Sequence, residues 1–154
     1  MSLALENYQW AQALIQGLVD LGCRHFFIAP GSRNAPLSMA CLRHSQQHSE
    51  INSHTHFDER SLAFAALGAA KVSREPTVVI TSSGSAVANL LPAVVEAFQT
   101  QAPLILLTAD RPDELVGCGA NQAIQQQGIF SSHVETALNL PSPSTQVPLN
   151  WLLT

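Results

Sequence analysis

Four short polar segments carry the residues best suited to chemistry, and each follows a segment expected to form a strand. The segments are PGSRN (30–34), FDER (57–60), SSGS (82–85) and ADRP (109–112). The guanidinium of Arg33 or Arg111 offers a planar, permanently charged fork of donors that suits a carboxylate or a phosphate. Either arginine could instead pair with a nearby acid, as Asp110 could with Arg111. Two arginines at one crevice favour an anionic ligand more strongly than either does alone.

The SSGS segment offers hydroxyl and backbone N–H groups where a helix is expected to begin, and such a turn can bind an anion. It lacks the lysine of a P-loop and does not fit the GxGxxG pattern of dinucleotide-binding proteins. A tight turn between a strand and a helix, with a serine cap, explains the same residues equally well. Both interpretations remain open from the residues alone.

Glu59 follows Asp58, a good helix N-cap, and precedes an alanine-rich segment that should be buried. A carboxyl group in such a partly apolar setting is suited to proton transfer. The alternative is an acidic first-turn residue favoured by the helix dipole. His54 and His56 lie two residues apart without an evident third ligand, so packing or hydrogen bonding is favoured over metal binding.

Alternating strands and helices must position these segments. Apolar runs predict strands over 25–29, 77–81 and 104–108, and a weaker alternation of Asn52, His54 and His56 with smaller or apolar residues predicts one over 51–56. Apolar residues at helical spacing and alanine-rich stretches predict helices from the N-cap Asn7 to Gly22, from about 35 to 44, from Asp58 to about 73, and over 86–98. The segment 113–130 is expected to form a loop with a short helix, and 134–140 to form a last strand.

This alternation is typical of an α/β fold, a parallel sheet with helices on both faces. In such sheets ligands bind at the carboxyl ends of the strands, where the four polar segments begin. All four are therefore expected to meet at one edge of the sheet.

Composition restricts the class of protein. The chain has 154 residues, 46% of them hydrophobic and 12% charged, which predicts one folded domain and too few charges to cover its surface alone. A net charge of −4 without a basic stripe disfavours nucleic-acid binding. The apolar runs are shorter than the roughly 18 residues of a membrane span, and the N-terminus does not resemble a secretory signal. These features predict a cytoplasmic protein with reduced cysteines and a partner domain or subunit.

Prolines and serines after residue 140 are typical of a linker. We expect residues 1–140 to form the domain and 141–154 to comprise a linker and the start of a truncated next element.

Five ordered segments carry a family resemblance: IAPGSR (28–33), HTHFDER (54–60), TSSGSAVANLLPA (81–93), LLTADRP (106–112) and CGANQAI (118–124). They resemble the N-terminal, pyrimidine-binding domain of the 2-succinyl-5-enolpyruvyl-6-hydroxy-3-cyclohexene-1-carboxylate synthase family, thiamine-diphosphate enzymes of menaquinone biosynthesis. The resemblance covers nearly the whole chain. It implies decarboxylation of 2-oxoglutarate followed by addition of the succinyl-semialdehyde carbanion equivalent to isochorismate.

The resemblance also implies roles for individual residues. Glu59 is expected to be catalytic and to hydrogen-bond the N1′ nitrogen of the cofactor's aminopyrimidine, and the other cofactor-binding residues are expected to be Pro30, Ser83 and Gly84. The expected substrate contacts are Ser32, Arg33, Arg111, Asn121 and Gln122. Ser85 stands where the family is expected to carry threonine, and the hydroxyl is kept.

In this family Mg²⁺ or Mn²⁺ is held by aspartate and asparagine residues of a diphosphate-binding domain, and the sequence GDG followed by paired asparagines does not occur here. We therefore expect no metal ligand on this chain, no activity of the chain alone, and at least a homodimer in the active enzyme. The alternatives are the pyrimidine domain of another thiamine-diphosphate decarboxylase or carboligase, and a non-catalytic nucleotide- or anion-binding α/β module.

Overall fold

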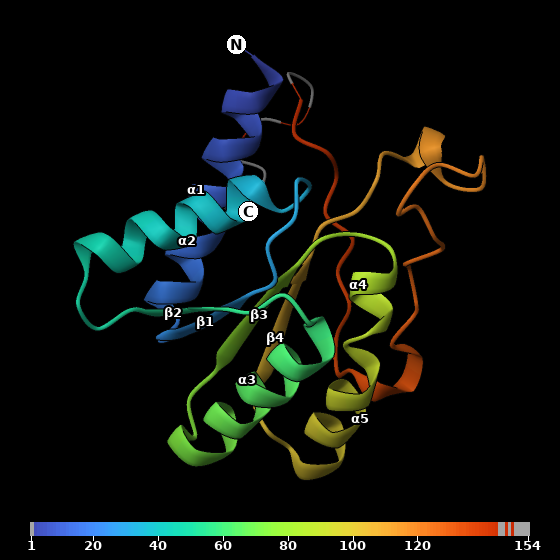
Figure 1. Ribbon diagram of the computed structural model, residues 1–154. Coiled ribbons are helices and arrows are strands. Elements are labelled where there is room, and N and C mark those ends of the chain that lie inside the picture. The colour runs from blue at the N-terminus through green and yellow to red at the C-terminus, as the bar shows by residue number, and fades with distance from the viewer. Residues whose placement is uncertain (1, 145–146, 148, 150–154) are drawn as a thin grey trace.

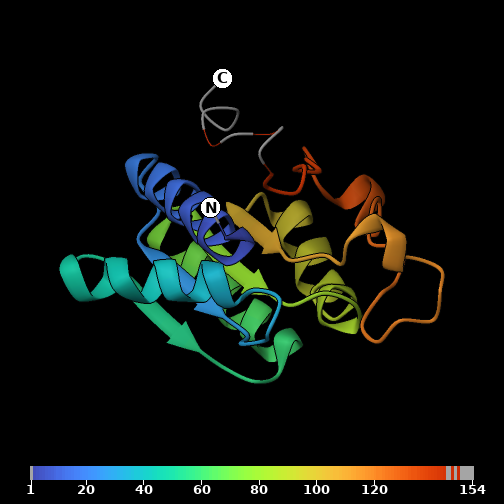
Figure 2. The same cartoon turned by 90° about the horizontal axis from the view of Figure 1, so that it is seen from above.

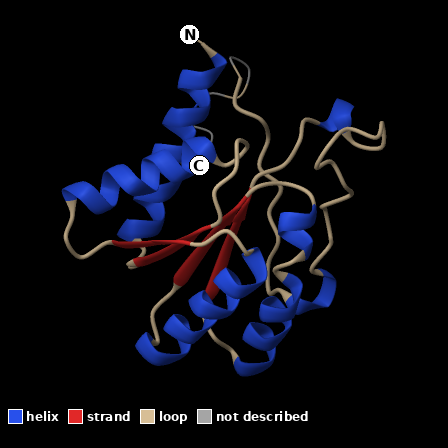
Figure 3. Ribbon diagram, in the orientation of Figure 1, coloured by secondary structure: helices blue, strands red, loops and turns tan. Residues whose placement is uncertain are grey.

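A four-stranded sheet forms the centre of the protein in the computed structural model, which describes residues 2–144, 147 and 149. The strands are β1 (His25–Ile28), β2 (Asn52–Thr55), β3 (Thr77–Thr81) and β4 (Leu104–Thr108). Their spatial order is β2-β1-β3-β4, and every neighbouring pair is parallel (Figure 3). The predicted α/β fold with a parallel sheet is confirmed.

Helices cover both faces of this sheet. They are α1 (Leu3–Asp20), α2 (Ala35–Gln47), α3 (Glu59–Ser73), α4 (Ser85–Ala88) and α5 (Leu91–Thr100). Side chains alternate along a strand, so Phe26 and Ile28 pack with α1 and α2, whereas Phe27 packs with α3 and α5. Figures 1 and 2 show α1 and α2 together on one side of the sheet and α3 and α5 on the other.

The first helix begins earlier than the sequence predicts. Ser2, with φ −77° and ψ 144°, is the N-cap residue, so the predicted cap Asn7 lies within α1. The carbonyl of Ser2 accepts the N–H groups of Leu5 and Glu6 at 2.9 and 3.1 Å, which satisfies donors of the first turn. The predicted end is correct, because Gly22 follows the helix with a φ of 96° that glycine adopts readily.

The predicted helix over 86–98 is interrupted. Pro92 has no backbone N–H, and its ring would clash with the carbonyl of Ala88 in a continuous helix. The chain therefore leaves α4 at Ala88 and begins α5 at Leu91, with Asn89 in the break.

The predicted last strand is wrong. Residues 134–140 pair with no strand of the described sheet, and Leu138 is 81% exposed. The outer edge of β4 is unpaired among the described strands, and Val134 packs in the same apolar cluster as Leu104 and Leu106, but the segment forms no β-ladder with it. The loop predicted over 113–130 is present, with a 3-10 turn at Asp113–Leu115, and another turn follows at Ser131–His133.

No regular helix or strand occurs in the described part of the predicted linker; residues 145–146, 148 and 150–154 of it lie outside the described residues. Among the helices that the structure describes, none is both long and apolar enough to cross a membrane.

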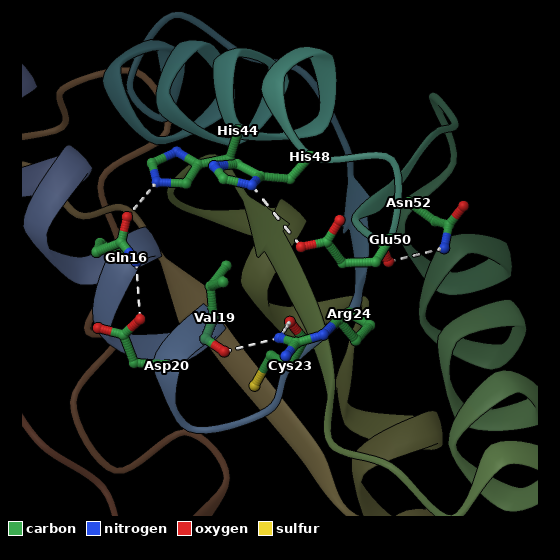
Figure 4. Close-up of polar contacts among 9 residues, drawn as sticks. All are labelled: Gln16, Val19, Asp20, Cys23, Arg24, His44, His48, Glu50 and Asn52. Atoms are coloured by element: carbon green, nitrogen blue, oxygen red, sulfur yellow. Dashed lines mark hydrogen bonds and ion pairs between the residues drawn. The ribbon is translucent and has the colours of Figure 1, made fainter.

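A polar cluster joins α1 and α2 near the amino ends of the strands (Figure 4). His44 Nε2 lies 3.0 Å from Gln16 Oε1, and Gln16 donates to Asp20 at 2.8 Å. Arg24, just before β1, donates to the carbonyl of Val19 at 2.7 Å and so satisfies the end of α1. This cluster lies at the sheet edge opposite the four polar segments, so we assign it to the packing of α1 and α2.

Candidate functional site

The four polar segments begin side by side, as predicted, because hydrogen bonds continue the sheet beyond its strands. Ala29 donates its backbone N–H to Ile80 at 2.9 Å, His56 donates to Ile28 at 3.2 Å, and Ala109 donates to Thr81 at 3.0 Å. The chain thus leaves all four strands at one edge.

A buried asparagine shapes the turn after β1. Asn34 is fully buried; its Oδ1 accepts the N–H of Gly31 and its Nδ2 donates to the carbonyl of Ala29, both at 2.8 Å. Ser32 and Arg33 project into solvent, where the Arg33 guanidinium donates to the Ser32 hydroxyl at 2.8 Å. Asn34 therefore fixes the backbone, while the two predicted substrate contacts stay accessible.

This turn packs directly on the one that follows β3. A Cβ on Gly31 would lie 2.6 Å from Cβ and 2.8 Å from Oγ of Ser82, distances that real side chains do not tolerate. Pro30 precedes this contact and is exposed. The glycine is required here because two loops approach closely.

Glu59 is the first residue of α3 and is partly buried at the sheet edge. Asp58 caps the helix by accepting the N–H of Ser61 at 2.7 Å, a hydrogen bond that lowers the pKa of Asp58. One carboxylate oxygen of Glu59, Oε2, accepts a hydrogen bond from the Asn89 amide at 3.3 Å. The other oxygen has no partner among the described residues, so it is available to a ligand.

Protein groups already use the SSGS turn. Gly84 has φ 78° and ψ −134°, and a Cβ on it would lie 2.9 Å from Cα of Gln122. The Ser83 hydroxyl donates to the carbonyl of Gln122 at 2.8 Å, and the N–H of Gly84 donates to Gln126 Oε1 at 2.7 Å. An N–H group bonded in this way cannot be aimed at an anion, and α4 is one turn long. The geometry weakens the interpretation of this turn as a phosphate nest.

Arg111 is held by backbone rather than by the acid beside it. Its Nη2 donates to the carbonyl of Asn121 at 2.6 Å, whereas Asp110 accepts the backbone N–H of Arg111 at 2.7 Å. The Nε of Arg111 is buried without a hydrogen-bond partner among the described residues. Asn121 and Gln122 are exposed, and Gln122 has a φ of 56°. Asp110 does not neutralise the guanidinium, which is oriented toward the turn that carries the two predicted substrate contacts.

The structure thus joins most of the predicted residues through direct contacts. Pro30 and Ser32 flank Gly31, which meets the turn of Ser83 and Gly84, and that turn meets Gln122. Glu59 is connected to the break after α4 through Asn89. The sequence analysis missed three residues that hold this arrangement: Asn34, Asn89 and Gln126. The only signals for them were the polar residue at the end of PGSRN and the proline that breaks the helix.

A family model described as "Thiamine pyrophosphate enzyme, N-terminal TPP binding domain" matches residues 9–133. The chain belongs to this family. Proteins named 2-succinyl-5-enolpyruvyl-6-hydroxy-3-cyclohexene-1-carboxylate synthase are close relatives. The one from Vibrio atlanticus (strain LGP32) is 58% identical over 98% of this chain and 26% of its own length. The one from Actinobacillus pleuropneumoniae serotype 7 (strain AP76) is 50% identical over 99% of this chain and 27% of its own length.

The chain therefore spans about a quarter of the length of the curated relatives that it matches. The resemblance stated from the sequence motifs is confirmed.

The residues present fit the pyrimidine half of thiamine diphosphate. Glu59 offers a carboxylate oxygen without a partner among the described residues, beside the turns that begin at Pro30 and Ser83. The described residues contain no group of three or more histidine, cysteine, aspartate or glutamate side chains that could hold a metal ion. The arrangement can orient an aromatic nitrogen base and bind carboxylates.

Proposed function

We propose that this chain is the pyrimidine-binding domain, over residues 1–140, of an enzyme that uses thiamine diphosphate to decarboxylate 2-oxoglutarate and to add the resulting four-carbon unit to isochorismate in menaquinone biosynthesis. Identities of 50–58% over nearly the whole chain to synthases of that name carry the proposal. Residues 141–154 are then a linker and the start of the next, truncated element. The enzyme is a cytoplasmic homodimer or higher homo-oligomer, and its Mg²⁺ or Mn²⁺ ligands lie in its diphosphate-binding domain.

The cofactor, when bound, supplies an electron sink for carbon–carbon bond cleavage and formation. Glu59 is the catalytic residue of this chain, because its carboxyl group can hold or release a proton at N1′ of the aminopyrimidine. The bond from Asn89 occupies one oxygen of Glu59 and orients the other. Pro30, exposed in the turn after β1, and Ser83 and Gly84, buried in the turn after β3, would hold the pyrimidine half of the cofactor.

The remaining exposed residues suit the substrates. Isochorismate and 2-oxoglutarate both carry two carboxylates, and Arg33 and Arg111 supply permanent positive charges at the ends of two strands. The hydrogen-bonding groups of Ser32, Asn121 and Gln122 can contact carboxylate and hydroxyl oxygens. Recognition of dianions explains why a chain of negative net charge places arginines here.

A first test is the coding sequence downstream of Thr154, where the proposal requires a diphosphate-binding domain with an aspartate and asparagine metal motif. Full-length enzyme should consume 2-oxoglutarate with isochorismate and should not turn over pyruvate alone. The reverse preference would assign the domain to another thiamine-diphosphate decarboxylase or carboligase. Tight binding of ATP but not of thiamine diphosphate in calorimetry would instead support a nucleotide-binding module.

The role of Glu59 is tested by Glu59→Gln in the full-length enzyme. The amide keeps the size of the side chain but cannot hold the same proton, so turnover should fall about a hundredfold or more, the scale of general acid–base catalysis. Thiamine diphosphate should still bind in calorimetry. The matched control is Glu75→Gln, an exposed residue between α3 and β3 at the opposite edge of the sheet, which should leave turnover unchanged. Near-normal turnover of Glu59→Gln would contradict the assigned role.

A further inference from the structure

Gln126 differs from the two glutamines beside it. Gln125 and Gln127 are exposed, whereas Gln126 is 9% exposed and is one of the few buried polar residues of the chain. A buried amide must find hydrogen-bond partners or destabilise the fold. Its position in an irregular segment, outside every helix and strand, means that secondary structure does not account for its burial.

The amide of Gln126 connects the turns that follow two neighbouring strands. Its Oε1 accepts the backbone N–H of Gly84 at 2.7 Å, and its Nε2 donates to the carbonyl of Ala109 at 3.0 Å. A backbone N–H can only donate and a carbonyl can only accept, so these two partners fix which end of the amide is oxygen. One side chain thereby joins the turn after β3 to the turn after β4.

The segment that Gln126 anchors also carries the residues expected to contact substrate. Between Asp113 and Phe130 its regular structure is limited to one short 3-10 turn, so side-chain bonds must position Asn121 and Gln122. Besides the bonds of Gln126, these are the bond from Ser83 to the carbonyl of Gln122 and the bond from Arg111 to the carbonyl of Asn121. The missing side chain of Gly84 lets the backbone of Gln122 approach.

We propose that Gln126 is a positioning residue that fixes the turn of Asn121 and Gln122, which contacts substrate, against the turn of Ser83 and Gly84, which borders the cofactor. The inference rests on the proposed function for the identity of the two ligands. The part of the inference that concerns the protein alone is that Gln126 acts as a clamp, meaning that its hydrogen bonds hold the segment 118–128 against the SSGS turn. This part rests only on those hydrogen bonds, and the deuterium uptake of the segment measures it separately.

The first variant is Gln126→Leu in the full-length enzyme, because leucine has a similar size and no hydrogen-bonding group. It leaves the Gly84 N–H and the Ala109 carbonyl without their partner, so the segment should detach from the SSGS turn. Deuterium uptake of the peptide covering 118–128 should rise, and the KM for isochorismate should rise about tenfold or more. The dissociation constant of thiamine diphosphate should change less than about threefold. Gln125→Leu is the matched control and should change none of these quantities.

The second variant, Gln126→Glu, keeps the oxygen that accepts from Gly84. Its ionised form cannot donate to Ala109, whereas its protonated form can. The KM defect should therefore shrink as the pH falls, a recovery that Gln126→Leu cannot show. This distinguishes positioning through the two bonds from a general loss of packing, and it remains informative if the leucine variant does not fold.

Unchanged deuterium uptake and unchanged KM in folded Gln126→Leu would overturn the inference. It would also be overturned if the ratio of the KM of Gln126→Glu to that of the wild type did not change with pH. Failure of the wild-type enzyme to use 2-oxoglutarate and isochorismate would overturn the proposed function instead. In that case the deuterium-uptake comparison would still decide whether Gln126 acts as the clamp.

Discussion

Alanine at position 31 would place a methyl group between the turns after β1 and β3. The added carbon would lie 2.6 Å from Cβ and 2.8 Å from Oγ of Ser82, whereas non-bonded carbon atoms settle at about 3.5–4.0 Å. The two turns must therefore separate by about 1 Å. Ser82 is buried and adjoins the end of β3, so it cannot yield by simply rotating into solvent.

Inserting a methyl group into a packed interior costs about 1–3 kcal/mol, so we expect Gly31→Ala to lower the free energy of unfolding by about 2 kcal/mol. For a chain of this size that is a decrease in Tm of about 4–8 °C. Gly17→Ala in α1 is the matched control, because no atom other than those of the adjoining residues and the backbone of the helix itself lies within 4 Å of the added carbon. Alanine in a helix interior should stabilise the chain by up to about 1 kcal/mol.

A double-mutant cycle with Ser82→Gly identifies the contact. Glycine at position 82 removes both clashing atoms, so the double variant should be about 1–2 kcal/mol more stable than the sum of the single changes predicts. The assay is urea unfolding followed by far-UV circular dichroism. If the two changes add to within about 0.5 kcal/mol, or if Gly31→Ala behaves like Gly17→Ala, the close packing of these two turns is refuted.

Three further predictions concern titratable groups. Burial raises the pKa of the Cys41 thiol to about 12, whereas Cys118 is exposed. Iodoacetamide at about pH 8 should therefore alkylate Cys118 long before Cys41, as measured by peptide mass spectrometry. Equal rates of alkylation would contradict the burial of Cys41. Because folding raises this pKa, the neutral Cys41 thiol stabilises the folded state below the pKa of an unfolded thiol, and this stabilisation is lost as the pH rises from about 9 toward about 12. Cys41→Ala should therefore flatten the decline of the free energy of unfolding at alkaline pH. The hydrogen bond from the Ser61 N–H lowers the pKa of Asp58. The ionised Asp58 carboxylate therefore stabilises the folded state above about pH 4, and this stabilisation is lost as the pH falls below that value. Asp58→Asn keeps a capping oxygen and should reduce the acid dependence of the urea midpoint, and an unchanged dependence would show that the cap is not formed.

The sequence predicted the sheet well because three of its strands are short and apolar and strong turn signals separate them, whereas β2 is polar and gave a weaker signal. TVVIT became β3 with every residue buried, and HFFI became the neighbouring central strand. The same reasoning failed at 134–140, where alternating apolar residues indicated a strand. Alternation indicates that a segment could pair, but whether it meets an edge strand in register depends on the path of the whole chain.

The site was predicted less completely than the fold. Proposed ligand contacts such as Glu59 and Arg111 were singled out by their type and by the loops that carry them, and their roles follow from the family resemblance. Asn34, Asn89 and Gln126 act instead on other parts of the protein. The partners of Asn89 and Gln126 lie 17 to 42 positions away, and a single sequence contains no record of which distant groups will meet. The partners of Asn34 are backbone groups within five positions.

The break in the predicted helix over 86–98 connects the fold to the site. Without Pro92, the segment from Ser85 to Thr100 could continue as one helix, and residue 89 would lie within it. Asn89 lies in this interruption, and its amide donates to Glu59. Gly31 and Gly84 act in a comparable way, because their missing side chains allow turns from different strands to touch. Departures from regular structure therefore bring the candidate site together, and substitutions that would make these positions more regular should separate its parts.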